Sequence, residues 1–247
     1  MVLTPEDMEL LKTGPEAFFS ALLHPISAFL EKISGPFATE VGAAFGDKAK
    51  LYRLKNAVHC IKKAKVMLEE AGIDPGQVEP KILLPLLEHA SLEDGEELQD
   101  RWAALLANAA NPSSDTGLSP AFIDVLRQLS PHEAAFLDLL CPSPTVKEKE
   151  LVFSPGSPFY SDLIKEWQQA TGGMNPDRIP FTLDNFVRLG IFRIITRPSS
   201  MGVGEVSISD LPQQQPIQSV IWDDQYAFTD FGRKFLIACR KPQPEIS

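Results

Sequence analysis

The sequence predicts a mainly α protein with one small antiparallel hairpin close to its C-terminus. Apolar residues recur every three or four positions through most of the 247 residues, as they do on the buried face of a helix. Proline and glycine interrupt these stretches where helices are expected to begin and end. The pattern changes to strand character only after Gly190, where the segment 191–196 (IFRIIT) is β-branched and aromatic.

The composition is that of a globular protein, with 44% hydrophobic and 23% charged residues. A net charge of −10 disfavours non-specific binding of the whole surface to nucleic acid or anionic membrane. The three cysteines lie far apart and form no CxxC pair, so we expect neither a disulfide framework nor a zinc knuckle. We expect a cytoplasmic protein, because the first residues do not resemble a signal peptide and no uncharged apolar run is long enough to span a membrane.

The first half is expected to be entirely helical. A short amphipathic helix is predicted over 3–13, and a second helical stretch runs from 17 to 33, where Gly35-Pro36 breaks it. A long helix begins at Asp47 with a near-heptad apolar seam and ends at Ala71-Gly72. Pro80 begins an apolar helix over 80–90 that is kinked or restarted near Pro85.

The segment from Ser91 to Asn111 (SLEDGEELQDRWAALLANAAN) is predicted to be the last helix of this half. Ser91 and Asp94 resemble a capping box, and acids crowd the first turns, where the helix dipole favours them. An apolar stripe then follows at helical spacing, and Asn111-Pro112 ends the helix. We interpret the acids from Glu93 to Asp100 as a solvated helix start and not as a catalytic carboxylate site.

The second half follows a linker at 111–120 that is rich in proline, serine and glycine. Helices are expected over 121–129, 131–141 with Ser130 as N-cap, 158–171 and 180–189, with strands over 191–196 and 221–229 and a closing helix over 230–239. The segment 202–209 (GVGEVSIS) either pairs with the first strand or lies in a long wing. This order resembles a winged helix. We therefore expect a helical domain at 1–112 and a winged-helix-like α+β domain with a small antiparallel hairpin at 118–247.

Two neighbouring segments of the first half are candidates for an interaction surface. The apolar stretch from Ala17 to Phe45 is either a membrane-interface anchor, a core face or an oligomer contact, and we favour core or self-association. The basic helix from Lys48 to Lys65 either binds phosphates or has a solvated face that the acid-rich helix partly neutralises, and we favour the second interpretation. The candidate surface residues are Phe18, Phe29, Phe37, Lys48, Lys55, Lys62, Lys63 and Arg188.

No residue pattern points to catalysis, a cofactor or a metal. The four histidines have no cysteine or acid at ligand spacing, and we expect structural or surface roles for them. The chain has no phosphate-binding GKT or GKS loop, no nucleophile elbow and no HExxH motif. We therefore expect no catalytic residues, no cofactor, no metal and no enzymatic activity.

The second half invites comparison with DNA-binding winged helices. From Leu118 to Ser247 there are 12 bases and 15 acids, a net charge of −3. The candidate recognition helix, near 176–189, carries Arg178 and Arg188 beside Asp177 and Asp184, and a DNA-reading helix usually has a basic face. Contact with a protein partner or self-association is therefore favoured over nucleic acid, and a winged-helix transcriptional regulator is the alternative function.

The stretch from Leu51 to Leu140 resembles the bacterial abortive-infection alpha family. The most distinctive part is the segment 85–109, PLLEHASLEDGEELQDRWAALLANA. The resemblance implies a helical fold over this stretch and a role in phage defence, and it carries no catalytic residues with it. The function expected from it is a non-enzymatic antiphage protein of the cytoplasm that acts on a partner or by peripheral contact with the inner membrane.

Overall fold

The computed structural model describes residues 24–35, 48–114, 118–140, 152–154, 158–173, 175–198 and 222–243. In these residues the fold is mostly helical with one small antiparallel sheet, which confirms the predicted fold class. The chain divides into two compact units. Unit 1 comprises Met1–Ala134 and Lys234–Ser247, and unit 2 comprises Ala135–Arg233. The expected domains, 1–112 and 118–247, and the winged-helix likeness stay predictions.

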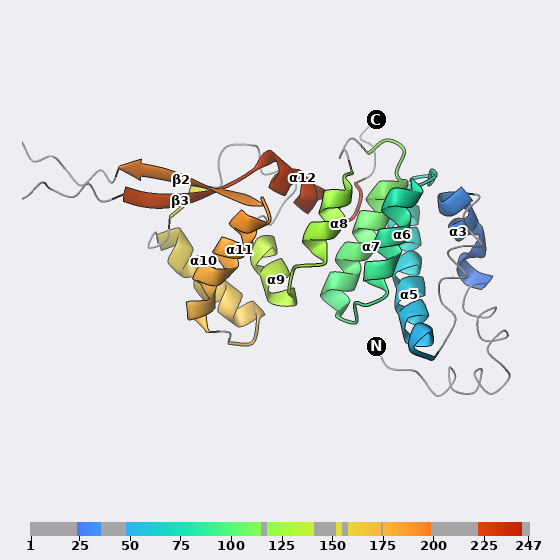
Figure 1. Cartoon of the computed structure of the whole chain (residues 1–247), viewed down its shortest axis with the longest axis horizontal. Helices are drawn as coiled ribbons and strands as arrows, with labels where there is room; N and C mark the ends of the chain where they lie inside the picture. Colours follow the sequence, from blue (N-terminus) through green and yellow to red (C-terminus); the bar gives the residue numbers. More distant parts are fainter. Residues whose placement is uncertain are drawn as a thin grey trace, which may run out of the picture. The chain divides into compact units, whose positions relative to one another are not determined.

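Unit 1 is built from helices that lie side by side (Figure 1). Its described elements are η1 (His24–Ile26), α3 (Ser27–Ser34), α5 (Lys48–Ala71), α6 (Pro80–Ala90), α7 (Glu96–Ala110) and α8 (Pro120–Leu126), with the start of α9 (Pro131–Leu140) and the end of α12 (Asp230–Ala238). The bounds of α5, α6, α9 and α12 agree with the expected helices to within one residue, whereas α8 ends at Leu126, before the expected residue 129. Helix α6 continues through Pro85.

The core of unit 1 lies between α5, α6 and α7, and apolar residues at helical spacing fill it. Leu105 and Leu106 of α7 are fully buried, and Trp102 is 2% exposed. Helix α3 joins this core through Ile26 and Ile33, and the Val78 backbone N–H donates to the Ile33 carbonyl at 2.8 Å. The apolar face of α3 is therefore occupied by packing within the unit.

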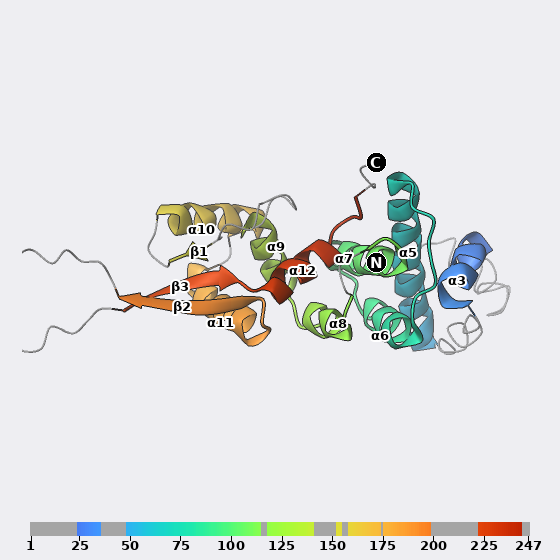
Figure 2. The ribbon, with the colours of Figure 1, turned by 90° about the horizontal axis from the view of Figure 1, so that it is seen from above.

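Unit 2 combines helices with a three-stranded antiparallel sheet. Its elements are the rest of α9, β1 (Val152–Phe153), α10 (Pro158–Ala170), η3 (Pro176–Arg178), α11 (Ile179–Arg188), β2 (Phe192–Pro198), β3 (Trp222–Phe228) and the start of α12. Strand β3 lies between β1 and β2 (Figure 2), and Ile194 is opposite Tyr226 in the β2–β3 register. The two-residue β1 is too short for a sequence pattern and was not expected.

A chain of aromatic rings forms the core of unit 2. Phe136 of α9 lies 5.7 Å from Trp167 of α10 and 6.1 Å from Phe186 of α11, measured between ring centroids. Phe186 contacts Phe192 of β2 at 5.4 Å, and Phe192 contacts Phe228 of β3 at 4.5 Å. The Phe136–Phe186 pair is stacked and the other three are edge-to-face, and aromatic pairs of both kinds add about 0.5–1.5 kcal/mol each beyond burial of area. They hold α11 firmly against the sheet.

The predicted start of the helix at Ser91 is wrong. Helix α7 begins at Glu96, its N-cap is Gly95, and no side chain caps it. Ser91 instead follows α6 with helical dihedrals, φ −66° and ψ −23°, and its hydroxyl donates to the Glu88 carbonyl at 2.5 Å. A capping box needs an extended N-cap residue, so Ser91 and Asp94 cannot form one here.

Other expectations fall outside the described residues. These are the helix over 3–13, the first part of the apolar stretch with Phe18, the residue Phe37, and the segment 202–209.

Candidate functional site

Charged and hydrogen-bonding side chains gather where α5 meets the segment 91–100. Tyr52, Asn56, His59 and Lys63 follow one another on α5 at intervals of four, three and four residues, which places them on one face of the helix. We call the contact that they make the α5–α7 seam. Its members are Tyr52, Arg53, Asn56, His59 and Lys63 from α5, and Ser91, Asp94, Glu96 and Asp100 from the facing segment.

The first part of the seam holds the turn between α6 and α7. The Arg53 Nε donates to Ser91 Oγ at 3.0 Å, and the Asn56 Nδ2 donates to the Ser91 carbonyl at 3.2 Å. The Tyr52 hydroxyl donates to Asp94 Oδ2 at 3.2 Å. Since Ser91 and Asn56 are buried, these bonds satisfy polar groups that are cut off from water, and they fix the turn on α5.

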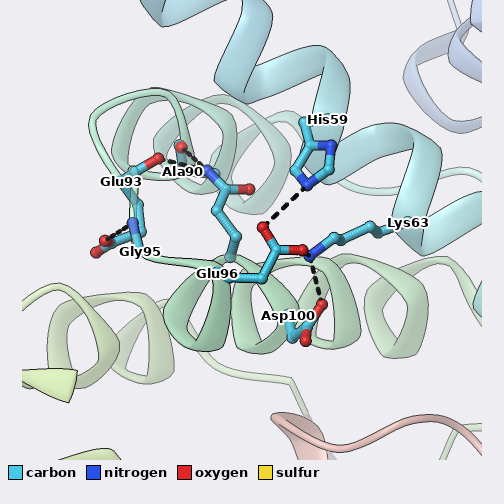
Figure 3. A network of polar contacts seen from close by, with 8 residues as sticks. His59, Lys63, Ala90, Glu93, Gly95, Glu96 and Asp100 are labelled. Atoms are coloured by element: carbon cyan, nitrogen blue, oxygen red, sulfur yellow. Dashed lines mark hydrogen bonds and ion pairs between the residues drawn. The ribbon is translucent and has the colours of Figure 1, made fainter. Parts of the chain in front are cut away.

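The second part of the seam is an ionic cluster (Figure 3). The Lys63 Nζ forms ion pairs with Glu96 and, at 2.6 Å, with Asp100 Oδ1. The His59 Nε2 lies 3.6 Å from Glu96 Oε2, which is too long for a hydrogen bond. The Lys63 side chain is only 18% exposed, whereas those of Glu96 and Asp100 are 71% and 56% exposed. The cluster is therefore sheltered on the α5 side and open to solvent on the α7 side.

The surroundings set the charge of each group in the cluster. Partial burial opposes the charge of Lys63, but its hydrogen bonds to Asp100 and Glu96 outweigh this effect and raise its pKa. The hydrogen bond from Lys63 lowers the pKa of Glu96. Burial, followed by the nearby Lys63 ammonium, lowers the pKa of His59 in spite of Glu96. At neutral pH these shifts keep Lys63 charged, Glu96 ionised and His59 neutral.

Two buried residues beside the cluster complete its structure. The Gln99 Nε2 donates to the carbonyls of Ala90 and Glu93, both at 2.7 Å, and so ties α7 to the end of α6. Burial raises the pKa of the Cys60 thiol to about 12, which leaves it protonated and unreactive. Chemically, the seam is a set of ion pairs and hydrogen bonds that joins α5 to α7 and the turn before it. Within the described residues, no group of three or more histidines, cysteines and acids is placed to hold a metal ion.

The structure separates the predicted site residues. Phe29 is buried in α3, 7% exposed, which favours its interpretation as a core residue. Lys55 is also buried, Lys63 belongs to the seam, and Lys62 is exposed. Arg188 is exposed on α11, where it donates to Asn185 Oδ1. Phe18, Phe37 and the Lys48 side chain lie outside the described residues.

The acid-rich helix was expected to neutralise part of the basic helix, and the ion pairs of Lys63 confirm this. Sequence reasoning missed the roles of Tyr52, Asn56 and His59. Their helical spacing was a usable signal, because it places three polar residues on the same face as the lysine that the acids neutralise.

The membrane-spanning capacity of the described helices and the likeness of the chain to known proteins bear on its function. No described helix is both long enough and apolar enough to cross a membrane. No curated protein and no solved structure matches the chain. The family model of abortive infection alpha matches residues 49–239, a span that contains the seam, the sheet and every described helix from α5 to α12. The chain therefore belongs to the abortive infection alpha family.

Proposed function

We propose that this protein is an antiphage protein of the bacterial cytoplasm that acts by binding a protein partner and not by catalysis. The role in abortive infection is supported by the family match over residues 49–239. The non-enzymatic mechanism is supported by the contacts of the polar residues in the segment 85–109, which bond to other residues of the protein. Ser91, Glu96 and Asp100 are all engaged by α5.

A catalytic site needs polar groups that converge on a substrate in a cleft. In the seam most of the polar groups bond to one another or to backbone, and His59 Nε2 and Gln99 Oε1 are the buried side-chain atoms there without a hydrogen-bond partner in the described residues. The buried Gln99 bonds to backbone carbonyls, and the Lys63 ammonium is shared by two carboxylates of α7. This use of the side chains supports a structural role for the segment and leaves binding to the outer surfaces of the helices.

A protein partner is favoured over a membrane by the same contacts. A peripheral anchor needs its apolar and basic side chains on the surface. Phe29 and Lys55 are buried, and Lys63 is committed to Glu96 and Asp100. Among the four candidate surface residues of α3 and α5 whose side chains are described, namely Phe29, Lys55, Lys62 and Lys63, only Lys62 is therefore exposed.

The defence role is tested by plating a broad phage panel on bacteria with and without the gene. We expect fewer plaques, for at least one phage, on cells that carry it. Equal plaque counts for every phage would show that the protein does not protect.

The non-enzymatic mechanism is tested with isosteric variants of the seam. Glu96→Gln, Asp100→Asn and His59→Gln remove an acid or a base with little change of shape. We expect each variant that stays folded by circular dichroism to protect as well as the wild type. A folded variant that loses protection, together with turnover of a nucleotide or ester by the purified wild type, would contradict the proposal.

A further inference from the structure

The outer face of α11 carries an ordered row of side chains. The row begins with Asp177 of η3, which leads directly into α11, and continues with Phe181, Asp184 and Arg188 of α11 at intervals of four, three and four residues; all four are exposed. The opposite face is buried through Ile179, Thr182, Leu183 and Phe186. Phe181 is 74% exposed, more than any other large hydrophobic side chain in the described part of the chain. Contact of this ring with a second molecule would remove its apolar surface from water.

The hairpin beside α11 also exposes apolar surface, on the face of the sheet that the helix covers. Ile194 of β2 is 44% exposed and lies opposite Tyr226 of β3, so the two side chains point to the same face of the sheet. Helix α11 lies against β2. Ile194 and Tyr226 share their sheet face with Phe192, which packs against Phe186 on the buried side of α11, so the outer row of α11 is a surface separate from this face.

Along the row, the side chains are in order an acid, an aromatic ring, an acid and a base. This order is complementary to itself when two copies run antiparallel, because Asp177 of each copy then faces Arg188 of the other. A parallel arrangement would place each of these charges beside its own kind. DNA is a poor occupant, since Asp177 and Asp184 offset Arg178 and Arg188 along η3 and α11.

We propose that α11 is the contact surface of a symmetric homodimer, in which two copies of the helix pair antiparallel about a two-fold axis between Phe181 and Asp184. The two Phe181 rings then lie roughly 4.5 Å apart along the helix direction, since they are three residues apart at a rise of about 1.5 Å each. Each ring covers the other, and two Asp177–Arg188 pairs flank them. An isologous interface of this kind uses the same patch on both copies.

One helix face is smaller than the roughly 800 Å² per partner of a stable dimer. The association is therefore reversible and concentration-dependent. This inference goes beyond the proposed antiphage function and does not rest on it, because a monomeric protein can also bind a partner.

The test is sedimentation equilibrium of the full chain over a wide concentration range. We expect the wild type to approach a dimer at high concentration, Phe181→Ser to remain monomeric, and Asp177→Arg or Arg188→Asp to weaken association about tenfold or more. The decisive variant is the double swap Asp177→Arg/Arg188→Asp, which restores the two pairs in reverse and returns association to within about threefold of the wild type. The control is Glu166→Arg, an exposed charge change on α10, which leaves association unchanged.

Three results would overturn the proposal. They are a wild type that is monomeric at every concentration, a dimer that Phe181→Ser leaves intact, and single charge variants that the double swap does not rescue. A monomer that instead binds duplex DNA through Arg188 would assign the face to nucleic acid. Each result is independent of the plating assay, so failure of the dimer is distinguishable from failure of the defence role.

Discussion

His59 lies between a carboxylate that favours its protonation and an environment that opposes it. The effects of burial and of the Lys63 charge outweigh that of Glu96, so the pKa of His59 in the folded protein lies below the usual 6.5. The unfolded chain therefore binds more protons than the folded chain between this lowered pKa and about 6.5. Stability is thus expected to fall as the pH is lowered through that window, and the loss is complete below the folded pKa.

The variant His59→Gln tests this expectation, because it removes the titrating group and keeps a polar side chain. The free energy of unfolding of the wild type should drop more than that of the variant between pH 7.5 and pH 5. The matched control is His24→Gln, at an exposed position in η1. A wild type that gains stability relative to His59→Gln on acidification would reverse the assigned direction of the pKa.

Two serines show how local geometry decides the role of a sequence pattern. Ser91-Leu92-Glu93-Asp94 and Ser130-Pro131-His132-Glu133 both match a capping signature. Only the second forms it: Ser130 N–H and Oγ donate to Glu133 Oε2 at 2.8 Å, and Glu133 N–H donates to Ser130 Oγ at 3.3 Å. The Pro131 ring is preorganised for the first helical position there, whereas Ser91 continues the turn of α6. The pattern alone could not separate the two.

Adjacent lysines on α5 separate the contribution of the seam from that of general surface charge. Lys63 joins α5 to α7 through two carboxylates, whereas Lys62 is exposed. Lys63→Gln leaves Glu96 and Asp100, which are neighbours at i and i+4, without their shared cation. Since both acids are largely exposed and screened, we expect a loss of only about 1 kcal/mol of unfolding free energy.

Chemical denaturation at low and high salt measures this loss. The effect of Lys63→Gln should shrink at 1 M salt, where screening acts over about 3 Å. Lys62→Gln should have little effect at either salt concentration. Equal effects of the two substitutions would show that the cluster does not stabilise the contact between the helices.

The turn before β2 and the start of α12 meet with almost no space between them. Gly190 has a φ of +74°, and the Thr229 hydroxyl donates to its carbonyl at 2.5 Å and accepts from the Gly232 N–H at 2.8 Å. A Cβ on Gly232 would lie 2.3 Å from the Ile191 carbonyl oxygen. This contact is with backbone, which cannot rotate away.

Gly232→Ala is therefore expected to destabilise the protein by about 2 kcal/mol or more, although alanine is the better helix former. The control is Lys234→Ala, at an exposed position of the same helix, which should be neutral or slightly stabilising. Thermal and urea unfolding of the two variants measure the difference. A Gly232→Ala protein as stable as the wild type would mean that α12 and the turn can move apart freely.

The helices were predictable because proline and glycine mark their ends and apolar residues mark their buried faces. Pro80, Pro120, Pro131 and Pro158 each begin a described helix. The seam was predictable only in outline, as an acid-rich helix that neutralises a basic one. The pairing of Lys63 with Glu96 spans 33 residues of sequence, and nothing local in the chain specifies which acid meets which lysine. The short β1 depends on its pairing with Tyr226 and Ala227 of β3, which is likewise a long-range contact.

Unit 1 is not continuous in sequence, because it closes with residues from the other end of the chain. Phe235 of α12 lies edge-on to Phe122 of α8, with ring centroids 5.9 Å apart. The family match ends at residue 239, at the end of this same helix. We call the part of unit 1 that begins at Lys234 the closing segment. The family match includes its helical part, and a domain boundary drawn from composition alone would separate it from the helices that it completes.

Besides the Phe122–Phe235 contact, a buried amide and an exposed ion pair join the described part of the closing segment to other helices of unit 1. The Asn108 Nδ2 of α7 lies within hydrogen-bonding distance of the carbonyls of Ala238 and Arg240, at 3.0 and 2.8 Å, and of Ala104 in its own helix. Asn108 is 6% exposed, so Asn108→Ala leaves these carbonyls without the amide donor in a site with little water. We expect a loss of about 2–3 kcal/mol of unfolding free energy.

The comparison is Lys241→Ala, which removes the exposed ion pair from Lys241 to Glu70 at 3.2 Å. We expect that variant to lose less than about 0.5 kcal/mol, because exposed pairs contribute little. Hydrogen exchange adds a readout of location: Asn108→Ala should raise the exchange of amides in α12 and α8 more than in α10. Uniform exchange changes, or equal losses from the two variants, would show that the closing segment is not held through the core of unit 1.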